Sequence, residues 1–185
     1  MKPSQRCQSV QLIITDVDGV LTDGRVIYDN QGIESKAFYI RDGLGIKLWR
    51  KAGGKFAIIT GRNSHVVQLR ASELGIDAVR QGIEDKRKTA DEIMRHFGVT
   101  AEQTAYIGDD LPDMAVMQIV GLAVAPADAA NEVRDAAHHV TQLAGGRGCV
   151  RELVEFILQN QKRWDDVIQM YSSSVSPAAG TSQRT

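Results

Sequence analysis

Two groups of acidic residues are the part of this 185-residue sequence best suited to do chemistry. Asp16 and Asp18 directly follow the short apolar segment 10–15, and Asp109 comes just after a second such segment, 104–107. If the two segments are neighbouring strands, these carboxylates converge at one sheet edge, where a cation or a shared proton must offset their repulsion. Mg²⁺ prefers such oxygen ligands and keeps positions for water and phosphate. We therefore predict a Mg²⁺ site with Asp16, Asp18 and Asp109 as its ligands.

Each acidic group also has a purely structural interpretation. An Asp at a strand end can cap the turn that follows, and acidic residues are common in the first turn of a helix. Asp110 and Asp113 follow Asp109 at the start of a predicted helix. We expect these two residues to position the metal ligands without contacting the ion themselves.

Groups suited to phosphate follow at two more positions. Thr60, Gly61 and Arg62 come directly after the apolar segment 55–59 and just before a predicted helix. The N-terminal N–H groups of such a helix can bind phosphate oxygens. Lys86 opens another predicted helix and offers a compact positive charge. Taken alone, Lys86 resembles an ordinary surface lysine, so its role depends on whether the fold brings it to the acidic groups.

The spacing of apolar residues predicts an alternation of short strands and helices. Short β-branched apolar stretches are typical of buried strands, and apolar residues three or four apart are typical of helices. The alternation predicts an α/β fold, a Rossmann-like doubly wound parallel sheet with helices on both faces. The predicted strands are 10–15, 55–59, 77–80, 104–107 and 122–124, and the predicted helices are about 44–51, 64–74, 86–97 and 111–119.

Two segments interrupt this alternation. Residues 25–40 have the pattern of a β-hairpin inserted after the first strand, with its turn near residues 30–32. One amphipathic helix is expected over about 149–171, because its apolar residues form a single stripe. We predict one domain over residues 1–171 and a small, polar, unstructured tail over 172–185.

Composition excludes several classes of protein. The formal net charge is −1 and the hydrophobic fraction is 43%, which gives no reason to expect a nucleic-acid or membrane partner. No apolar run approaches the roughly 20 residues of a membrane span, and the N-terminus lacks the apolar core of a signal peptide. We expect a cytoplasmic protein whose two cysteines are reduced.

The ordered set of motifs resembles the haloacid dehalogenase superfamily of phosphatases. This resemblance implies that Asp16 attacks phosphorus, and that Asp18 protonates the leaving alkoxide and later activates water. Thr60 would hold phosphate oxygens, and Lys86 would offset the repulsion between the reacting anions. The implied catalytic residues are therefore Asp16, Asp18, Thr60 and Lys86. The matching motifs are Asp16 and Asp18, Thr60-Gly61, Lys86, and Gly108-Asp109-Asp110.

The intervals between these motifs leave no room for a cap domain. Between Asp18 and Thr60 there is space only for the hairpin and one helix, and between Thr60 and Lys86 only for one helix and one strand. Catalysis benefits from excluding bulk water. An open site would therefore be closed either by a macromolecular substrate or by a neighbouring subunit.

Among capless groups, the sequence resembles the 3-deoxy-D-manno-octulosonate (KDO) 8-phosphate phosphatases. The resemblance implies Mg²⁺, a small phosphorylated sugar-acid substrate of lipopolysaccharide precursor synthesis, and a homotetramer assembled through the hairpins. The segments that carry it are 16–24, 36–46, 57–62, 106–114 and 144–152.

The same resemblance implies which residues bind the substrate. A substrate with both carboxylate and phosphate groups needs several cations, and Arg offers bidentate contacts. Lys47 stands where an Arg is expected, and Cys149 stands where the family has a small Ala. The implied substrate-binding residues are Asp18, Tyr39, Ile40, Arg41, Asp42, Gly43, Lys47, Gly61, Arg62, Arg70 and Lys86.

Three alternatives remain open at this point. Phosphatases of nine-carbon sialic-type acid 9-phosphates share the fold and most motifs, although the Gly-rich segment 145–148 favours the eight-carbon substrate. A non-catalytic phosphatase-like assembly module would not need complete motifs. A phospho-accepting receiver domain also uses an acidic pair, a Thr and a Lys, but its acceptor Asp lies on a later strand.

Overall fold

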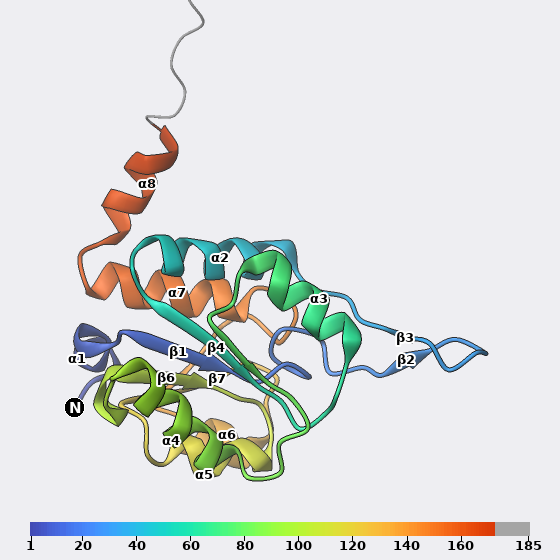
Figure 1. Cartoon of the computed structure of the whole chain (residues 1–185). Helices are drawn as coiled ribbons and strands as arrows, with labels where there is room; N and C mark the ends of the chain where they lie inside the picture. Colours follow the sequence, from blue (N-terminus) through green and yellow to red (C-terminus); the bar gives the residue numbers. More distant parts are fainter. Residues whose placement is uncertain (173–185) are drawn as a thin grey trace, which may run out of the picture.

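A computed structural model describes residues 1–172 and shows a central parallel sheet with helices on both faces (Figure 1). Its strand order is β5-β4-β1-β6-β7-β8, and every neighbouring pair is parallel. The predicted doubly wound parallel sheet is therefore confirmed. The strands are β1 (Leu12–Thr15), β4 (Lys55–Ile59), β5 (Ala78–Arg80), β6 (Thr104–Ile107), β7 (Leu122–Ala125) and β8 (His139–Val140).

The strand order creates a point of divergence between β1 and β6. From β1 the chain moves outward through β4 to β5, returns to β6 on the other side of β1, and continues outward to β8. Leu12 pairs with both Lys55 and Thr104, so the central strands run in register. Ligands of open α/β sheets bind beyond the carboxyl ends of strands at such a divergence. The residues that follow β1 and β6 therefore meet there.

Helices cover both faces because successive side chains of each strand point to opposite sides. Ile13 and Ile107 pack on the face with α2, α3 and α7, whereas Ile14 and Tyr106 pack on the face with α4, α5 and α6 (Figure 1). Short 3₁₀ turns cover Cys7–Ser9, Ala101–Gln103 and Leu111–Asp113. The helices are α1 (Pro3–Arg6), α2 (Ile40–Lys51), α3 (His65–Leu74), α4 (Lys86–Phe97), α5 (Met114–Met117), α6 (Asn131–Ala136), α7 (Cys149–Asn160) and α8 (Trp164–Ser172).

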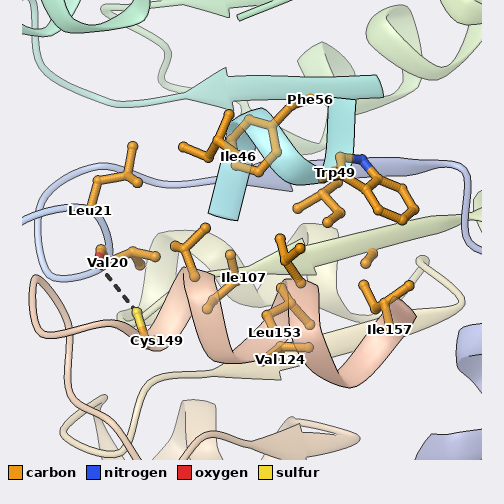
Figure 2. Packing of buried hydrophobic residues seen from close by; sticks show 14 of the residues in the cluster. Val20, Leu21, Ile46, Trp49, Phe56, Ile107, Val124, Cys149, Leu153 and Ile157 are labelled. Carbon is orange, nitrogen blue, oxygen red and sulfur yellow. Dashed lines mark hydrogen bonds between the residues drawn. The ribbon is translucent and has the colours of Figure 1, made fainter. Parts of the chain in front are cut away.

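The apolar core beneath α2 and α7 extends to the loop that follows β1. Figure 2 shows Leu153 of α7 and Trp49 of α2 packed in this core, and both side chains are fully buried. Burying a side chain of this kind contributes about 1.5–3 kcal/mol. At the start of α7, the Cys149 thiol donates a hydrogen bond to the Val20 carbonyl at 3.3 Å (Figure 2). Cys149, which stands where an Ala was expected, therefore links α7 to the loop that carries Asp16.

The hairpin exists but is shorter than the predicted segment 25–40. Its two antiparallel strands are β2 (Ile27–Tyr28) and β3 (Glu34–Ser35), and two N–H groups in the turn donate to the Asp29 carboxylate at 2.8 Å. The prediction was wrong at its C-terminal end, because α2 already begins at Ile40. Both strands are too short to be stable without other contacts.

The predicted helix over 149–171 is two helices, so that prediction was wrong. Lys162 has a φ of 57°, and the N–H groups of Lys162 and Arg163 donate to carbonyls of the last turn of α7 at 3.0 and 2.8 Å. These two bonds form a Schellman motif, in which Gly usually occupies the left-handed position. Because a Lys occupies it here, the sequence carries no visible stop signal.

Other boundaries differ by smaller amounts. Helix α2 begins at Ile40, earlier than predicted, because Gly43 and Gly45 lower the helix propensity of its first turns and so conceal them in the sequence pattern. The predicted helix 111–119 shortens to a 3₁₀ turn and the four residues of α5. Ser172 lies in α8, whereas residues 173–185 lie outside the described residues, so the unstructured tail stays a prediction. Within residues 1–172, no helix is long and apolar enough to cross a membrane.

Candidate active site

Asp16 is the first residue beyond β1, and its backbone is fixed between the two central strands. Its N–H donates to the carbonyl of Ile107, the last residue of β6, at 3.0 Å. Three N–H groups of the loop then converge on the Val17 carbonyl. Gly19 has a φ of 93°, and a Cβ atom there would lie 2.0 Å from the Asp109 carboxylate. A side chain at position 19 would therefore displace the Asp109 carboxylate.

Lys86 lies between two carboxylates that come from different strand ends. Its Nζ is 2.9 Å from Asp16 Oδ1 and 2.6 Å from Asp113 Oδ1, and only 6% of its side chain is exposed. Burial by itself lowers the pKa of Lys86, but the two negative charges outweigh burial and raise it. Lys86 is therefore a buried cation at neutral pH and not an ordinary surface lysine.

Asp113 accepts four hydrogen bonds, which join three parts of the site. Its Oδ1 accepts from Lys86 Nζ and from the Tyr106 hydroxyl, both at 2.6 Å. Its Oδ2 accepts from the N–H groups of Asp109 and Asp110 at 3.0 and 3.2 Å. Asp113 thus holds the loop after β6 and the lysine together. Sequence reasoning missed Tyr106, because its hydroxyl looks like any other polar atom on a buried strand.

Three carboxylates form a cluster that fits a divalent cation. Oxygen atoms of Asp16, Asp109 and Asp113 lie within 4.8 Å of one another. Burial first, and neighbouring carboxylates second, raise the pKa of Asp16 to about 6 and the pKa of Asp109 to about 7. Asp16 Oδ1 is buried and accepts no well-directed hydrogen bond, although Lys86 is near. A hard cation such as Mg²⁺ would offset this repulsion.

The hydrogen bonds within the cluster show which of its carboxylates are free to bind a cation. Both oxygens of Asp113 already accept bonds from the chain, so Asp16 and Asp109 are better placed than Asp113 to bind a cation. Asp18 lies in the same cleft but outside this three-carboxylate cluster, and its carboxylate is bonded to Lys36. A ligand role for Asp18 stays a prediction.

The segment after β4 forms the other wall of the site. The N–H of Thr60 donates to the Arg80 carbonyl at 3.0 Å, and its own carbonyl accepts from Ile83 at 3.1 Å. These bonds fix the Thr60 hydroxyl at the sheet edge. The resulting cleft has a volume of about 560 Å³, enough for a phosphorylated sugar. It is lined by Asp16, Asp18, Gly24, Thr60, Gly61, Arg62, Ile83, Glu84, Lys86, Asp109, Asp110, Pro112 and Asp113.

Charged residues of the hairpin segment bond to residues that line this cleft, and sequence reasoning missed these contacts. Arg62 donates to Glu34 at 2.7 Å and to the Tyr28 hydroxyl at 3.0 Å. Lys36 is bonded to Asp18. Alternating polar residues on a short hairpin are typical of a solvent-exposed face. The one sequence feature that indicated a functional role for Lys36 was its place in the segment 36–46, which carries part of the family resemblance.

Two predicted substrate-binding residues line a separate cleft. Tyr39 and Arg41 lie with Arg147 and Arg151 around a second space of about 600 Å³ at the start of α7. The two clefts share no lining residue. The structure of a single chain therefore does not bring Tyr39 and Arg41 to Asp16.

Asp42 is buried beneath this second cleft. Its side chain accepts hydrogen bonds from the N–H groups of Gly148 at 3.1 Å and Arg151 at 2.8 Å. Asp42 therefore satisfies N–H groups at the first turn of α7, which have no partner within their own helix. Burial raises the pKa of Asp42 to about 6, against the opposing effect of these bonds.

The remaining predicted substrate-binding residues lie around α2 and α3. A Cβ atom at Gly43 would lie 2.4 Å from Arg70 Nη2, so the glycine leaves room for this guanidinium. Arg70 also pairs with Glu73 at 2.7 Å. Ile40 is 73% exposed and Lys47 is exposed. None of these four predicted residues lines the cleft around Asp16.

The Gly-rich segment 144–148 packs directly on the loop that carries Asp16. A Cβ atom at Gly145 would lie 1.9 Å from the Gly19 carbonyl oxygen, and the Gly146 N–H donates to the Val20 carbonyl at 2.8 Å. Only residues without side chains can approach this closely. The segment thus shapes the Asp16 loop from outside the cleft.

Comparisons with known proteins agree with this geometry. A family model described as haloacid dehalogenase-like hydrolase matches residues 70–153. The 3-deoxy-D-manno-octulosonate 8-phosphate phosphatase KdsC of Haemophilus influenzae is 43% identical over 157 residues, which are 85% of this chain and 87% of that protein. KdsC of Escherichia coli K12 is 42% identical over 161 residues, 87% of this chain and 86% of that protein.

A solved structure gives the same relationship. The 3-deoxy-D-manno-octulosonate 8-phosphate phosphatase of Moraxella catarrhalis, in complex with magnesium ion, phosphate ion and KDO, superimposes with a TM-score of 0.89. The two sequences are 38% identical, and the match covers 91% of this chain and 97% of that one. The chain therefore belongs to the 3-deoxy-D-manno-octulosonate 8-phosphate phosphatase family of haloacid dehalogenase-like hydrolases.

Proposed function

We propose that this protein is a Mg²⁺-dependent phosphatase that hydrolyses KDO 8-phosphate to KDO and phosphate. The observation that carries the proposal is the cluster of the buried Asp16 and Lys86 with the half-buried Asp109 at the sheet edge, in a chain 43% identical to a KdsC phosphatase. The buried thiols of Cys7 and Cys149, which form no disulfide, support a reducing, cytoplasmic location.

Asp16 is the nucleophile of the proposed reaction. Its carboxylate attacks phosphorus, the bond between phosphorus and the sugar oxygen breaks, and an aspartyl-phosphate forms. Lys86, 2.9 Å from this carboxylate, offsets the repulsion between the two anions. Mg²⁺ bound near Asp16, Asp18 and Asp109 would supply further positive charge to the transferring phosphoryl group.

Asp18 moves the protons. It donates a proton to the leaving sugar oxygen, and its carboxylate then takes a proton from the water that attacks the aspartyl-phosphate. Thr60, Gly61 and Arg62 hold phosphate oxygens through a hydroxyl, backbone N–H groups and a cation. Asp110 and Asp113 position the metal ligands and Lys86 and do not contact the substrate. The bonds of Asp113 to Lys86 and Tyr106 support this role.

The remaining substrate contacts cross a subunit boundary in the proposed homotetramer. The residues concerned lie on the surface near the hairpin or beneath it, away from the cleft. Apolar hairpin residues that are 48–58% exposed support a subunit contact, because such contacts bury them and pair open strand edges. The proposed cross-boundary residues are Tyr39, Ile40, Arg41, Lys47 and Arg70, whereas the buried Asp42 and Gly43 act only through the neighbours they position, the first turn of α7 and Arg70.

Phosphate release from a panel of substrates tests the proposed function. The panel contains KDO 8-phosphate, a nine-carbon sialic-type acid 9-phosphate and simple sugar phosphates, each with Mg²⁺ and with excess chelator. We expect kcat/KM for KDO 8-phosphate to exceed that for the nine-carbon acid at least about tenfold, and activity to need Mg²⁺. No release from KDO 8-phosphate, or full activity in chelator, would contradict the proposal; Asp16→Asn reports contaminating phosphatase.

A further inference from the structure

Two charged residues at the end of the hairpin contact side chains that line the active-site cleft. Glu34 and Lys36 stand two residues apart, so in an extended chain their side chains lie on the same side. The ammonium of Lys36 is bonded to the Asp18 carboxylate and lies 3.5 Å from Glu34 Oε1. Only 1% of the Lys36 side chain is exposed. Lys36 is thus a buried cation held between two carboxylates.

Glu34 links Lys36 to the segment that follows β4. It accepts hydrogen bonds from Arg62 at 2.7 Å and from the Ser64 hydroxyl at 2.5 Å. The Ser64 bond first, and the charges of Lys36 and Arg62 after it, lower the pKa of Glu34, although burial opposes them. Ser64 is the N-cap of α3, which anchors Glu34 to the scaffold. Glu34 is therefore ionised and fixed at neutral pH.

The series Asp18–Lys36–Glu34–Arg62 differs from ordinary surface ion pairs. Exposed pairs contribute little, because water screens both charges. Here the lysine is withdrawn from water, a cost that only its two carboxylate partners offset. The two ends of the series come from the loops after the neighbouring strands β1 and β4, and both Asp18 and Arg62 line the cleft. The hairpin therefore sets the separation and direction of two groups that the reaction uses.

We propose that Lys36 and Glu34 are positioning residues of this phosphatase: Lys36 orients the carboxylate of Asp18, and Glu34 orients the guanidinium of Arg62. The inference rests on the proposed function of the cleft. It assigns the hairpin a role inside its own subunit's active site, in addition to any part in assembly. Loss of Lys36 should slow the proton-transfer steps, whereas loss of the Glu34 charge should weaken substrate binding through Arg62.

Steady-state kinetics of the full-length enzyme test Lys36. For Lys36→Met we expect kcat to fall about tenfold or more while KM changes less than about twofold, because a misplaced acid–base group slows chemistry rather than binding. Lys36→Gln retains a donor and should recover part of the loss. Lys51→Met removes an exposed lysine at the other end of α2 and serves as the control. An unchanged or higher kcat for folded Lys36→Met would overturn the assignment of Lys36.

A double-mutant cycle tests Glu34 separately. Glu34→Gln should raise KM about fivefold with little change in kcat, and should add nothing further when Arg62 is already Ala. Glu102→Gln, at the opposite sheet edge, is the matched control. Additive effects of Glu34→Gln and Arg62→Ala would overturn the role of Glu34, and if Lys36→Met does not fold, Lys36→Gln and this cycle decide the proposal.

Assays with a second substrate distinguish a failure of this inference from a failure of the proposed function. A wild type that hydrolyses a simple sugar phosphate but not KDO 8-phosphate would contradict the proposed substrate alone. The losses in Lys36→Met would still be measurable with that sugar phosphate, whose alkoxide leaving group also needs a proton, and their absence there would still count against the positioning role.

Discussion

The sheet edge and the surface around the start of α2 both carry charged side chains, but different forces hold them. At the sheet edge, Lys86 lies 2.6–2.9 Å from Asp16 and Asp113, and all three residues are buried. Near α2, Arg41 and Lys47 are exposed and line no part of the cleft at the sheet edge. Groups for chemistry are thus fixed by strand ends within one chain, whereas the groups near α2 that are predicted to recognise substrate stand on an exposed surface, which a second subunit completes only in the proposed tetramer.

The most severe test of the sheet edge removes its nucleophile. Asp16→Asn should lower kcat by more than about 10³-fold, because an amide cannot form the aspartyl-phosphate. The fold should persist, since the side chain keeps its size. Circular dichroism and phosphate-release kinetics measure the two effects. Substantial remaining turnover would remove Asp16 from the proposed role.

The metal cluster should be nearly as sensitive. Asp109→Ala is expected to weaken the apparent affinity for Mg²⁺ about 100-fold, because a hard cation loses one of its few anionic ligands. Titration of activity with Mg²⁺ gives this affinity. Asp110→Ala, which removes the neighbouring carboxylate, should change the affinity far less. Equal effects of the two variants would contradict the division between ligand and support.

The hairpin tests the other side of the comparison. Ile27→Glu places a charge at a 48% exposed apolar position and should dissociate the proposed tetramer, with kcat/KM falling about 30-fold although the sheet edge is intact. Phe38, an apolar residue of the segment 25–40 in which the hairpin was predicted, is less suitable for such a test, because it packs against the core of its own chain. Sedimentation velocity and kinetics are measured together. Gln31→Glu adds the same charge in the hairpin turn and should leave the assembly unchanged; a fully active monomer would contradict the proposal.

The same contrast explains what the sequence could predict. Asp16 and Thr60 were placed correctly at strand ends, because short apolar β-branched segments reveal buried strands and the edge follows from parallel order. The break at Lys162 was missed, because a non-glycine residue occupies a left-handed position. The contacts of Lys36 with Asp18 and of Glu34 with Arg62 were also missed. They depend on where the hairpin folds back onto the domain, and no local sequence pattern indicates that position.

A smaller effect on turnover is expected from the hydroxyl behind the catalytic lysine. Tyr106→Phe removes one of the two bonds to Asp113 Oδ1 without changing the ring. A hydrogen bond to a charged group is worth about 1.5–3 kcal/mol, so we expect a similar loss of stability and a fall in kcat of about tenfold. Urea denaturation and kinetics test both. An unchanged kcat in a destabilised protein would limit Tyr106 to a structural role.

The last prediction concerns Asp42, which lies beneath the second cleft, and the effect of its ionisation on the stability of the fold. Burial raises its pKa to about 6 from an ordinary value of 3.8, despite its bonds to Gly148 and Arg151. Between about pH 4 and pH 6, the unfolded chain has released this proton while the folded chain keeps it. The free energy of unfolding should therefore decrease as pH rises through this window, by up to about 3 kcal/mol, and then level off. Asp42→Asn lacks this ionisation, so the stability advantage of the wild type over the variant should be larger at pH 4.5 than at pH 7.5. Urea denaturation of both proteins at several pH values measures the difference, in which other titrating groups largely cancel. An advantage that grows with pH would instead show that the first turn of α7 holds Asp42 charged.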